Sequence, residues 1–158
     1  MCNEIIERLK KGAFLTVKDS DKVNTMTISW GNIGVNWRED IFVTLVRDSR
    51  YTKEFIDKNG KFTVTIPKND DMKDALAFCG SKSGRDYDKI KECNLSLAEG
   101  KAVDVPHIAC SSYVYECEVI YKMRMDTDAM TEDFKNTFYS DGDIHTFYFG
   151  KVKAFYEA

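Results

Sequence analysis

Four side chains that bind anions stand close together in the segment VRDSRYT. Arg47 and Arg50 carry planar guanidinium groups, which can hold the oxygens of a phosphate with two parallel hydrogen bonds. Ser49 and Thr52 add hydroxyl donors within the same short stretch. The chemistry that this set of groups favours is the recognition of a phosphate or another small anion.

The segment lies between an expected strand and an expected helix. Residues 41–46 (IFVTLV) are rich in β-branched residues and predict a buried strand. Residues 53–58 predict a short helix, with Thr52 as its N-cap and Gly60 at its end. Because the amides at a helix N-terminus are free and carry partial positive charge, an anion is stabilised there. We interpret the segment as a phosphate-binding element; the alternative is that the hydroxyl residues only cap the helix and the arginines are solvated.

A second candidate segment is NTMTISWGNIG, residues 24–34, in which polar side chains alternate on a strand that runs into a loop with glycine. The amide and carbonyl groups of a strand edge can bind a flat heterocycle, and Trp30 can pack beside it. The alternative is a strand with one solvated face and a tryptophan in the core.

A third candidate segment is CGSKSGRDYDKI, residues 79–90. It predicts a polar loop with two glycines, whose backbone a ligand can approach closely. Arg85 and Lys89 can reach an anion from this loop. The alternative is a solvated loop with an ion pair between arginine and aspartate.

The elements that must position these segments are mostly strands. Strands are expected at residues 13–17, 23–29, 41–46, 61–66, 113–125 and 144–156, and helices at residues 53–58, 70–79, 87–93 and 130–139. These strands do not alternate with helices as β–α–β units. The pattern predicts a mainly β protein with a few short helices, folded as an antiparallel barrel or sandwich.

The strand at residues 113–125 alternates cleanly between apolar and polar residues. The apolar set runs from Tyr113 through Tyr121 to Met123, and we expect it to point inward. Glu116 belongs to the opposite, outward face.

The last strand changes its pattern part of the way along. In its first half we expect Phe147 and Phe149 to point inward, and in its second half Val152, Ala154 and Tyr156. The change of phase near Gly150 predicts a β-bulge there.

The bulk composition limits the classes of function. The chain has 158 residues, 43% of them hydrophobic, which suits one domain over residues 1–158. A net charge of −3 without a basic block gives no electrostatic support for nucleic-acid binding. No apolar run reaches the length of a membrane span and the N-terminus lacks a signal-peptide core, so we expect a cytoplasmic protein. Five cysteines without a CxxC pair and two distant histidines favour no metal site.

Four segments together resemble one protein family. NTMTISWGNIGVNW, VRDSRYTKEFI, CGSKSGRDYDKIKECNL and HTFYFGKV stand in the order and spacing of the flavin reductase-like, FMN-binding split-barrel family, and the chain most resembles the subgroup that contains flavoredoxin. The resemblance runs from about residue 12 to about residue 155. It implies a six-stranded antiparallel split β-barrel, usually a homodimer with FMN bound near the subunit interface.

The resemblance also assigns site residues. The strand along the flavin ring matches Asn24, Met26, Thr27, Ser29 and Trp30, the phosphate and ribityl element matches Arg47, Ser49, Arg50, Tyr51 and Thr52, and the third segment matches Ser83, Gly84, Arg85, Asp86 and Lys89. His145 matches a histidine that faces the substrate side of the ring, with a capping or core role as the alternative.

The sequence departs from the family pattern at two positions. Asp40 stands where proline often follows the tryptophan loop, and Asp48 replaces the proline of VRPSR. A carboxylate at position 48 opposes anion binding unless it points outward.

The activity that the resemblance implies is that of an FMN-dependent oxidoreductase. A reduced nicotinamide or a redox protein would pass electrons through FMN to a small molecule, a metal ion, or an iron–sulfur or flavin partner. The alternative is a split barrel that binds flavin or haem without catalysis.

Overall fold

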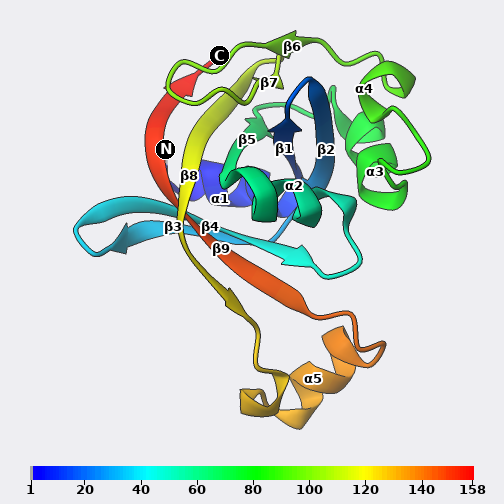
Figure 1. Ribbon diagram of the computed structural model, residues 1–158, viewed down its shortest axis with the longest axis vertical. Coiled ribbons are helices and arrows are strands. Elements are labelled where there is room, and N and C mark those ends of the chain that lie inside the picture. Colours follow the sequence, from blue (N-terminus) through cyan, green and yellow to red (C-terminus); the bar gives the residue numbers. More distant parts are fainter. Residues whose placement is uncertain (1) are drawn as a thin grey trace.

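The computed structural model describes residues 2–158 and is built on an antiparallel sheet of seven strands (Figure 1). In chain order these strands are β1 (Ala13–Asp19), β2 (Lys22–Ile28), β3 (Gly31–Asn36), β4 (Glu39–Arg47), β5 (Lys61–Pro67), β8 (Ser112–Arg124) and β9 (His145–Glu157). They lie in the order β2-β1-β5-β8-β9-β4-β3, and in the described chain the two end strands do not pair with each other. β6 (Leu97–Ala98) and β7 (His107–Ile108) form a separate small sheet.

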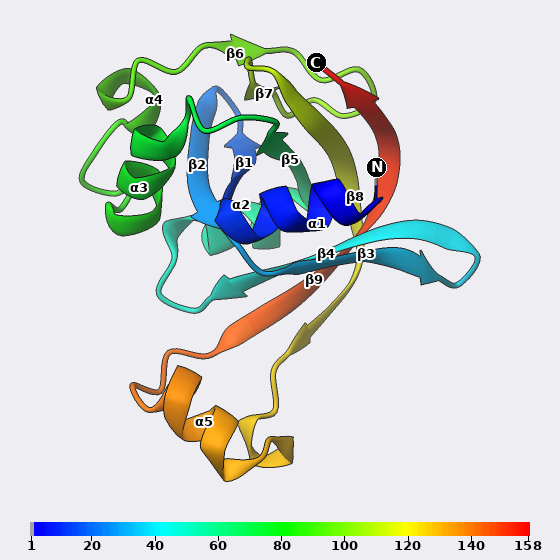
Figure 2. The ribbon, with the colours of Figure 1, turned by 180° about the vertical axis from the view of Figure 1, so that it is seen from behind.

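The helices are short and lie around the sheet. They are α1 (Cys2–Lys11), α2 (Tyr51–Asn59), α3 (Lys73–Ser81), α4 (Lys89–Glu92) and α5 (Glu132–Tyr139), with a 3-10 turn, η1 (Thr127–Ala129), before α5. α1 crosses one side of the sheet, α3 and α4 lie beside β2, and α5 lies apart at the far end of β8 and β9 (Figure 1, Figure 2). No helix among the described residues is long and apolar enough to cross a membrane.

The mainly β class with short helices is confirmed, and each of the six expected strands lies within two residues of its expected bounds. The sheet has seven strands rather than six, because residues 31–36 pair with β4 as β3. Five of the six residues of β3 are exposed, so no buried face marks this strand in the sequence. Its hydrogen bonds to β4 hold it in place.

The main core lies inside the curve of the sheet. Side chains from β1, β2, β4, β5, β8 and β9 meet there, and α1 and α2 close it. α1 is an element that the sequence analysis does not predict. Its Ile5 and Leu9, one turn apart and each 4% exposed, pack into this core, and its Arg8 donates to the Pro67 carbonyl at 2.7 Å. The spacing of these two apolar residues, with basic residues in the last turn, is the signal for the helix.

The start of α2 also differs from the prediction. Its N-cap is Arg50, and Thr52 lies inside the first turn with 1% of its surface exposed. Thr52 is therefore not the cap; its hydroxyl accepts a hydrogen bond from the Asn24 amide at 2.9 Å, which ties α2 to β2. The predicted end of the helix is confirmed, because Gly60 takes the left-handed conformation with φ of 69°.

The first half of β9 shows the opposite face to the one predicted. Tyr148 is fully buried in the main core, whereas Phe147 and Phe149 are only half-buried on the other face. Since all three residues are aromatic, hydrophobicity alone could not select the inward face. What distinguishes Tyr148 is its hydroxyl, which donates to the Asp57 carboxylate at 2.9 Å.

A bulge lies opposite Gly150, but it belongs to β8 and not, as was predicted, to the last strand. Val119 of β8 pairs with Gly150 and Tyr121 pairs with Phe149, which leaves Ile120 without a partner between them. A Cβ atom at position 150 would lie 2.5 Å from the Phe62 ring, so only glycine fits here.

Beyond this bulge, β8 and β9 leave the body of the protein and carry η1 and α5. We call residues 121–144 the arm (Figure 1). Tyr121 and Met123 were predicted to point inward, yet they are 44% and 45% exposed, because no layer of the described chain covers this part of the sheet. At the base of the arm, Asp57 accepts hydrogen bonds from Lys122 at 2.8 Å and from Tyr148. Although burial alone would raise it, these bonds and that from Lys53 lower the pKa of Asp57 to about 2.

Glu116 lies on the face of β8 opposite Tyr115 and Cys117, as predicted, but it is fully buried, because the loop after β6 covers that face. Its carboxylate accepts hydrogen bonds from the amides of Lys101, Ala102 and Val103 at 2.6–2.9 Å and from the Tyr156 hydroxyl at 2.7 Å. Burial alone would raise the pKa of Glu116, but these four bonds outweigh burial and hold the pKa below its usual value. Glu116 thus fixes the loop after β6 against β8.

We predict that Glu116→Gln lowers the free energy of unfolding by about 2–3 kcal/mol at pH 7, because a neutral amide accepts these bonds weakly and turns an N–H toward other donors. Tyr156→Phe, which removes one of the four bonds, should cost about 1 kcal/mol. Chemical denaturation measures both values.

The same substitution has a pH signature. The folded-state pKa of Glu116 is lowered, so its stabilisation is present above the unfolded pKa of about 4.3 and is lost as the pH falls through the folded pKa. The difference between wild type and Glu116→Gln should shrink on acidification. A difference that stays constant down to pH 3 would contradict a charged Glu116.

Candidate functional site

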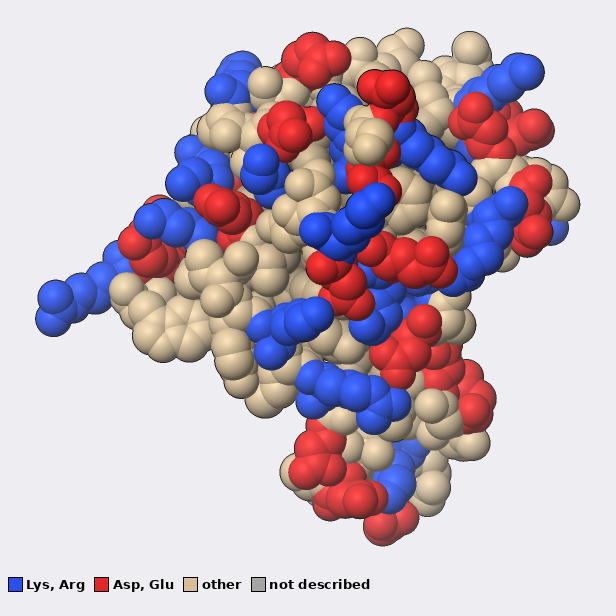
Figure 3. Space-filling view, in the orientation of Figure 1, with Lys and Arg blue, Asp and Glu red and all other residues tan. Residues whose placement is uncertain are grey.

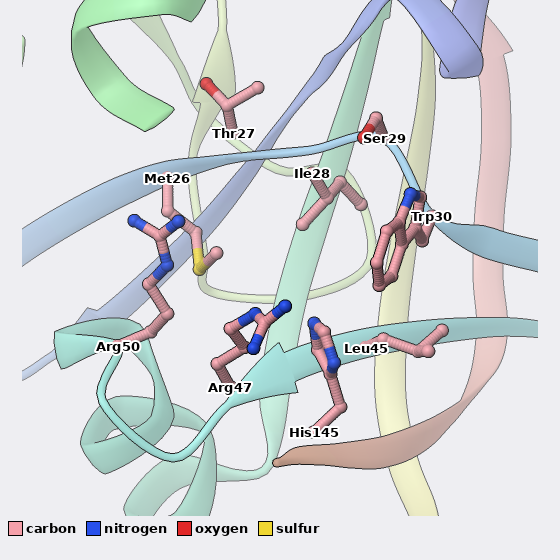
Figure 4. A pocket seen from close by; sticks show the side chains of 9 residues that line it. All are labelled: Met26, Thr27, Ile28, Ser29, Trp30, Leu45, Arg47, Arg50 and His145. Carbon is pink, nitrogen blue, oxygen red and sulfur yellow. The ribbon is translucent and has the colours of Figure 1, made fainter. Parts of the chain in front are cut away.

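A cavity of about 180 Å³ opens at the ends of β2 and β4, next to the start of β9 (Figure 4). We call it the first cavity. Part of its wall is apolar and part is cationic, and its lining residues are Met26, Thr27, Ile28, Ser29, Trp30, Leu45, Arg47, Arg50 and His145. Figure 4 shows the nitrogen-bearing ends of Arg47 and His145 side by side below β2, with Arg50 at one end and Trp30 at the other.

A second cavity of about 200 Å³ adjoins the first, because Met26 and Arg50 line both. It lies between the N-terminus of α2 and the loop after α3, and its other lining residues are Ser49, Tyr51, Thr52, Ser81, Lys82, Ser83, Gly84 and Lys89. Three of the lining side chains are cations, and none of the residues that line it is Asp or Glu. The second cavity therefore suits an anion.

Lys89 is the most deeply buried of these cations, with 5% of its surface exposed. Its Nζ donates to the Cys79 carbonyl at 3.0 Å, and it forms no ion pair with a carboxylate of the described chain. Burial lowers the pKa of Lys89, and the charge of Arg50 acts in the same direction. Because a lysine is rarely buried without an anionic partner, this side chain favours a bound anion beside it.

The N-terminus of α2 faces the same space. The helix has nine residues, and the amides of Tyr51 and Thr52 in its first turn donate to no acceptor in the described chain. Arg50 donates from Nη1 to the Gly80 carbonyl at 2.7 Å, which holds its guanidinium where the two cavities join. Free amides, the helix dipole and full charges thus converge on one position.

Asn24 and Gly84 meet at the border of a third cavity, which is polar and about 400 Å³ in volume. Gly84 and Lys89 line both the second and the third cavity. A Cβ at position 84 would lie 2.0 Å from the Asn24 Oδ1 atom, so this close approach of loop and strand requires glycine. Asn24 is 5% exposed and donates to Thr52, and it does not line the first cavity.

Arg47 and Ser49 hold the arm. Arg47 donates to the carbonyls of Asp143 at 2.5 Å and Phe138 at 3.0 Å. The amide and the hydroxyl of Ser49 both donate to the Asp143 carboxylate, at 3.0 and 2.6 Å. The Asp143 carboxylate therefore accepts from Ser49, whose donors the family resemblance assigns to a phosphate. Arg47 still lines the first cavity, and Ser49 lines the second.

Asp48 points away from both cavities. Its carboxylate accepts hydrogen bonds from Nε and Nη2 of Arg124 at 3.1 and 2.9 Å, and it lines neither the first nor the second cavity. The carboxylate that departs from the family pattern is thus paired with a cation of the arm.

Thr27 and Arg85 also have partners within the chain. The Thr27 hydroxyl donates to the Leu76 carbonyl at 2.6 Å, while the residue still lines the first cavity. Arg85 pairs with Glu54 at 2.5 Å and lies over the Tyr51 ring at 4.9 Å. Its guanidinium also donates to the Ser49 carbonyl at 3.2 Å, and the residue does not line the second cavity.

His145 lies at the start of β9, 7% exposed. Its Nδ1 atom is 2.8 Å from the Tyr139 hydroxyl, and the Trp30 ring lies 5.2 Å from its own. Burial lowers the pKa of His145 to about 4, and the charge of Arg47 acts in the same direction. The imidazole is therefore neutral at physiological pH.

The structure distributes the predicted residues over three adjoining cavities. The first is lined by Met26, Thr27, Ser29, Trp30, Arg47, Arg50 and His145, and the second by Met26, Ser49, Arg50, Tyr51, Thr52, Ser83, Gly84 and Lys89. Asn24, Arg85 and Asp86 line the third only. Four further lining residues were not predicted from the sequence: Ile28, Leu45, Ser81 and Lys82. Leu45 lies two residues before Arg47 on the same strand, so the period of two was the signal for it.

The described residues contain no group of three or more His, Cys, Asp or Glu side chains placed to hold a metal ion.

Comparison with known proteins gives the family. The model of the flavin reductase like domain matches residues 10–158. An uncharacterized protein from Archaeoglobus fulgidus is 31% identical over 107 residues, which is 68% of this chain and 59% of that protein. The match thus spans less than two thirds of the relative's own length.

Two solved structures share the fold. The FMN-binding protein from Thermus thermophilus with bound p-hydroxybenzaldehyde aligns with a TM-score of 0.73 at 22% identity, over 92% of this chain and 70% of that chain. Flavoredoxin from Methanosarcina acetivorans aligns with a TM-score of 0.72 at 24% identity, over 93% of this chain and 68% of that chain. With the family model matched over nearly the whole chain, this protein belongs to the flavin reductase-like domain family.

Proposed function

We propose that this chain is an FMN-binding oxidoreductase. The observation that carries the proposal is the second cavity. Three cationic side chains and the free amides of α2 meet there, and none of the described Asp or Glu residues lines it. The partly apolar first cavity lies next to it. A flat ring system joined to a phosphate has both properties that this pair of cavities recognises. FMN has this chemistry, and the Thermus relative of the same fold is an FMN-binding protein.

The volumes agree with a ligand that extends through both cavities. Neither reaches the roughly 300 Å³ of an ordinary ligand pocket by itself. They adjoin each other at Met26 and Arg50, and we propose that one elongated molecule occupies them together.

In this proposal the phosphate lies at the N-terminus of α2, where Arg50, Lys89 and the amides of Tyr51 and Thr52 donate to it. The flavin ring lies in the first cavity, packed by the apolar side chains of Met26, Ile28, Leu45 and Trp30. Arg47 and His145 place N–H groups beside it.

FMN, when bound, supplies the redox chemistry between an electron donor and an acceptor. The part of this chain is to bind the cofactor, orient it and limit the access of water. His145, with a pKa of about 4, stays neutral and is not suited to carry a proton at pH 7. We propose a reduced nicotinamide or a redox protein as the donor, and a small molecule, metal ion or redox protein as the acceptor.

Titration of the purified protein with FMN, followed by anaerobic addition of NADH or NADPH, tests this function. We expect a bound-flavin absorbance spectrum that bleaches with one of the two nicotinamides or with a reduced redox protein. The rival is a module that binds flavin or haem without catalysis. A protein that binds FMN but is bleached by none of these donors, or that binds haem and no FMN, would establish the rival.

We further propose that the chain forms a homodimer. Trp37, Tyr121 and Phe149 form an aromatic patch, with ring centroids 5.3–5.9 Å apart, and Trp37 is 60% exposed. Phe149 lies on the same face of the sheet as His145 and Leu45, which line the first cavity. Figure 3 shows few charged side chains on the lower flank of the projecting β3–β4 hairpin. A second copy on this face would cover the patch beside the flavin site.

Arg50→Ala should weaken FMN binding roughly 10- to 150-fold, because a charge-assisted hydrogen bond contributes about 1.5–3 kcal/mol. Riboflavin lacks the phosphate, so its affinity should change little. Fluorescence titration with both flavins measures the two affinities.

Lys53→Ala is the matched control for Arg50→Ala. It removes one positive charge from the first turn of the same helix, but its side chain pairs with Asp57 and lines neither cavity. Its FMN affinity should stay within about twofold of wild type, since an exposed ion pair contributes roughly 0–1 kcal/mol. If Arg50→Ala keeps a native circular dichroism spectrum but loses as much affinity for riboflavin as for FMN, Arg50 does not bind the phosphate.

Light scattering at micromolar concentration should give twice the 18.2 kDa mass of one chain. The double variant Trp37→Lys/Tyr121→Lys should be monomeric, because it places two charges in the aromatic patch. Leu97→Lys, an exposed apolar residue on β6, is the control and should remain dimeric. A wild-type monomer with flavin bound would rule out the proposed dimer.

A further inference from the structure

We propose that Tyr139 of α5 is a positioning residue, whose hydroxyl fixes the imidazole of His145 in the tautomer that carries its proton on Nε2. In this tautomer His145 offers a hydrogen-bond donor to the ligand of the first cavity. The inference rests on the proposed function only for the identity of that ligand.

The two side chains meet in a defined geometry. The Tyr139 hydroxyl lies 2.8 Å from Nδ1 of His145, and their rings stand at 89° with centroids 5.6 Å apart. Both residues are less than a tenth exposed, so water does not readily replace either partner. On its other side the imidazole packs against the Trp30 ring at 5.2 Å. The plane of the imidazole is therefore held from two sides.

The direction of the hydrogen bond follows from the donors and acceptors present. The Tyr139 hydroxyl has no other hydrogen-bond partner in the part of the chain that the structure describes. Burial raises the pKa of Tyr139, although Arg47 opposes this, so the phenol keeps its proton. The hydroxyl therefore donates, Nδ1 accepts, and the single proton of a neutral imidazole must be on Nε2.

The imidazole is neutral because of its surroundings. It is buried, and it faces two cations, Arg47 of β4 and Arg50 at the start of α2. Asp143 of the arm and Asp48 of the β4–α2 connection act in the opposite direction but do not outweigh them. With a pKa of about 4, His145 keeps the same protonation from pH 5 upward.

Nε2 is then a donor that faces the first cavity without a partner in the described chain (Figure 4). A buried N–H group without an acceptor is costly, and a ligand that supplies an acceptor removes this cost. The ligand group opposite His145 should therefore be a carbonyl oxygen or an unprotonated ring nitrogen. A flavin ring, or a carbonyl compound beside it, has such groups.

Tyr139 can serve this purpose although it belongs to the arm, because the arm is fixed at this point. Arg47 donates to the carbonyl of Phe138, the preceding residue, and its guanidinium lies 5.4 Å from the centre of the Tyr139 ring. Phe138 also contacts Trp30 edge to face, at 5.5 Å between centroids. Arg47 thus holds both the arm and the tyrosine that orients the histidine.

Long-range 1H–15N spectra of the 15N-labelled chain without flavin test the tautomer directly. The chain has two histidines, and His107 is an internal reference. Its Nδ1 lies 3.2 Å from the Ile108 carbonyl, which only accepts, so His107 should carry its proton on Nδ1. We expect the two histidines to show opposite tautomers. A proton on Nδ1 of His145 would overturn the proposal.

Tyr139→Phe removes the hydroxyl and keeps the ring. Because a hydrogen bond to Nδ1 stabilises the neutral imidazole, its loss should raise the titration midpoint of His145 by about half to one pH unit and populate the second tautomer measurably. The His107 signals should not change. Unchanged His145 signals and midpoint in a folded Tyr139→Phe variant would reduce Tyr139 to a packing residue.

Substitutions of His145 test whether its Nε2 atom donates a hydrogen bond to the ligand, with FMN and riboflavin as the probes. His145→Gln keeps an N–H near the position of Nε2 and should retain FMN and riboflavin affinity within about twofold, whereas His145→Leu should weaken both about threefold to tenfold. Equal affinities for the two variants would overturn the donor role. Wild-type protein that binds neither flavin would instead refute the proposed function, and the tautomer would still be decided by the spectra.

Discussion

The cations Arg50 and Lys89 meet at the N-terminus of α2 in a cavity that no Asp or Glu of the described chain lines, and much of the surrounding structure serves to hold them there. Like charges repel and a buried ammonium is costly, so each is fixed by a backbone carbonyl, from Gly80 and from Cys79. Both carbonyls belong to α3, which therefore supports the charges that the starts of α2 and α4 bring together. An anion at this position would neutralise a cluster that the chain itself leaves uncompensated.

Directly before Arg50, at Ser49, the chain supplies an anion of its own. Asp143 accepts from the amide and hydroxyl of Ser49, and its carbonyl accepts from Arg47. The donor groups around the start of α2 are thus divided: those of Arg47 and Ser49 fix the arm, and those of Arg50, Tyr51 and Thr52 face the second cavity. This division explains why the arm ends beside the cavity. The same attachment brings Phe138 onto Trp30 and Tyr139 onto His145.

Sequence patterns singled out residues that line one cavity where the local direction of the chain decides the position of a side chain. Arg50, Ser83, Gly84 and Lys89 follow directly from the ends of helices and from a loop with glycine, and they line one cavity. Sequence patterns did not predict the position of a side chain whose hydrogen-bond partner lies far away in the sequence. Thr52 bonds to Asn24 instead of capping α2, and Glu116 is buried on the outer face of β8 because three amides of a distant loop and the Tyr156 hydroxyl satisfy its charge. No spacing within a strand reveals such partners.

The sequence by itself determined the mainly β class, the six long strands and the short segments that carry the anion-binding groups, because periodicity and turn residues act over a few neighbours. The tertiary structure alone decided that β3 joins the sheet and which face of β9 is buried. It also decided which arginines and lysines bond to the arm and which line the second cavity. Pairing of β3 with β4, burial of Tyr148 and capture of Arg47 by the arm each depend on residues far apart in the chain. Burial and charge compensation are properties of the assembled core, so they become defined only when these distant segments meet.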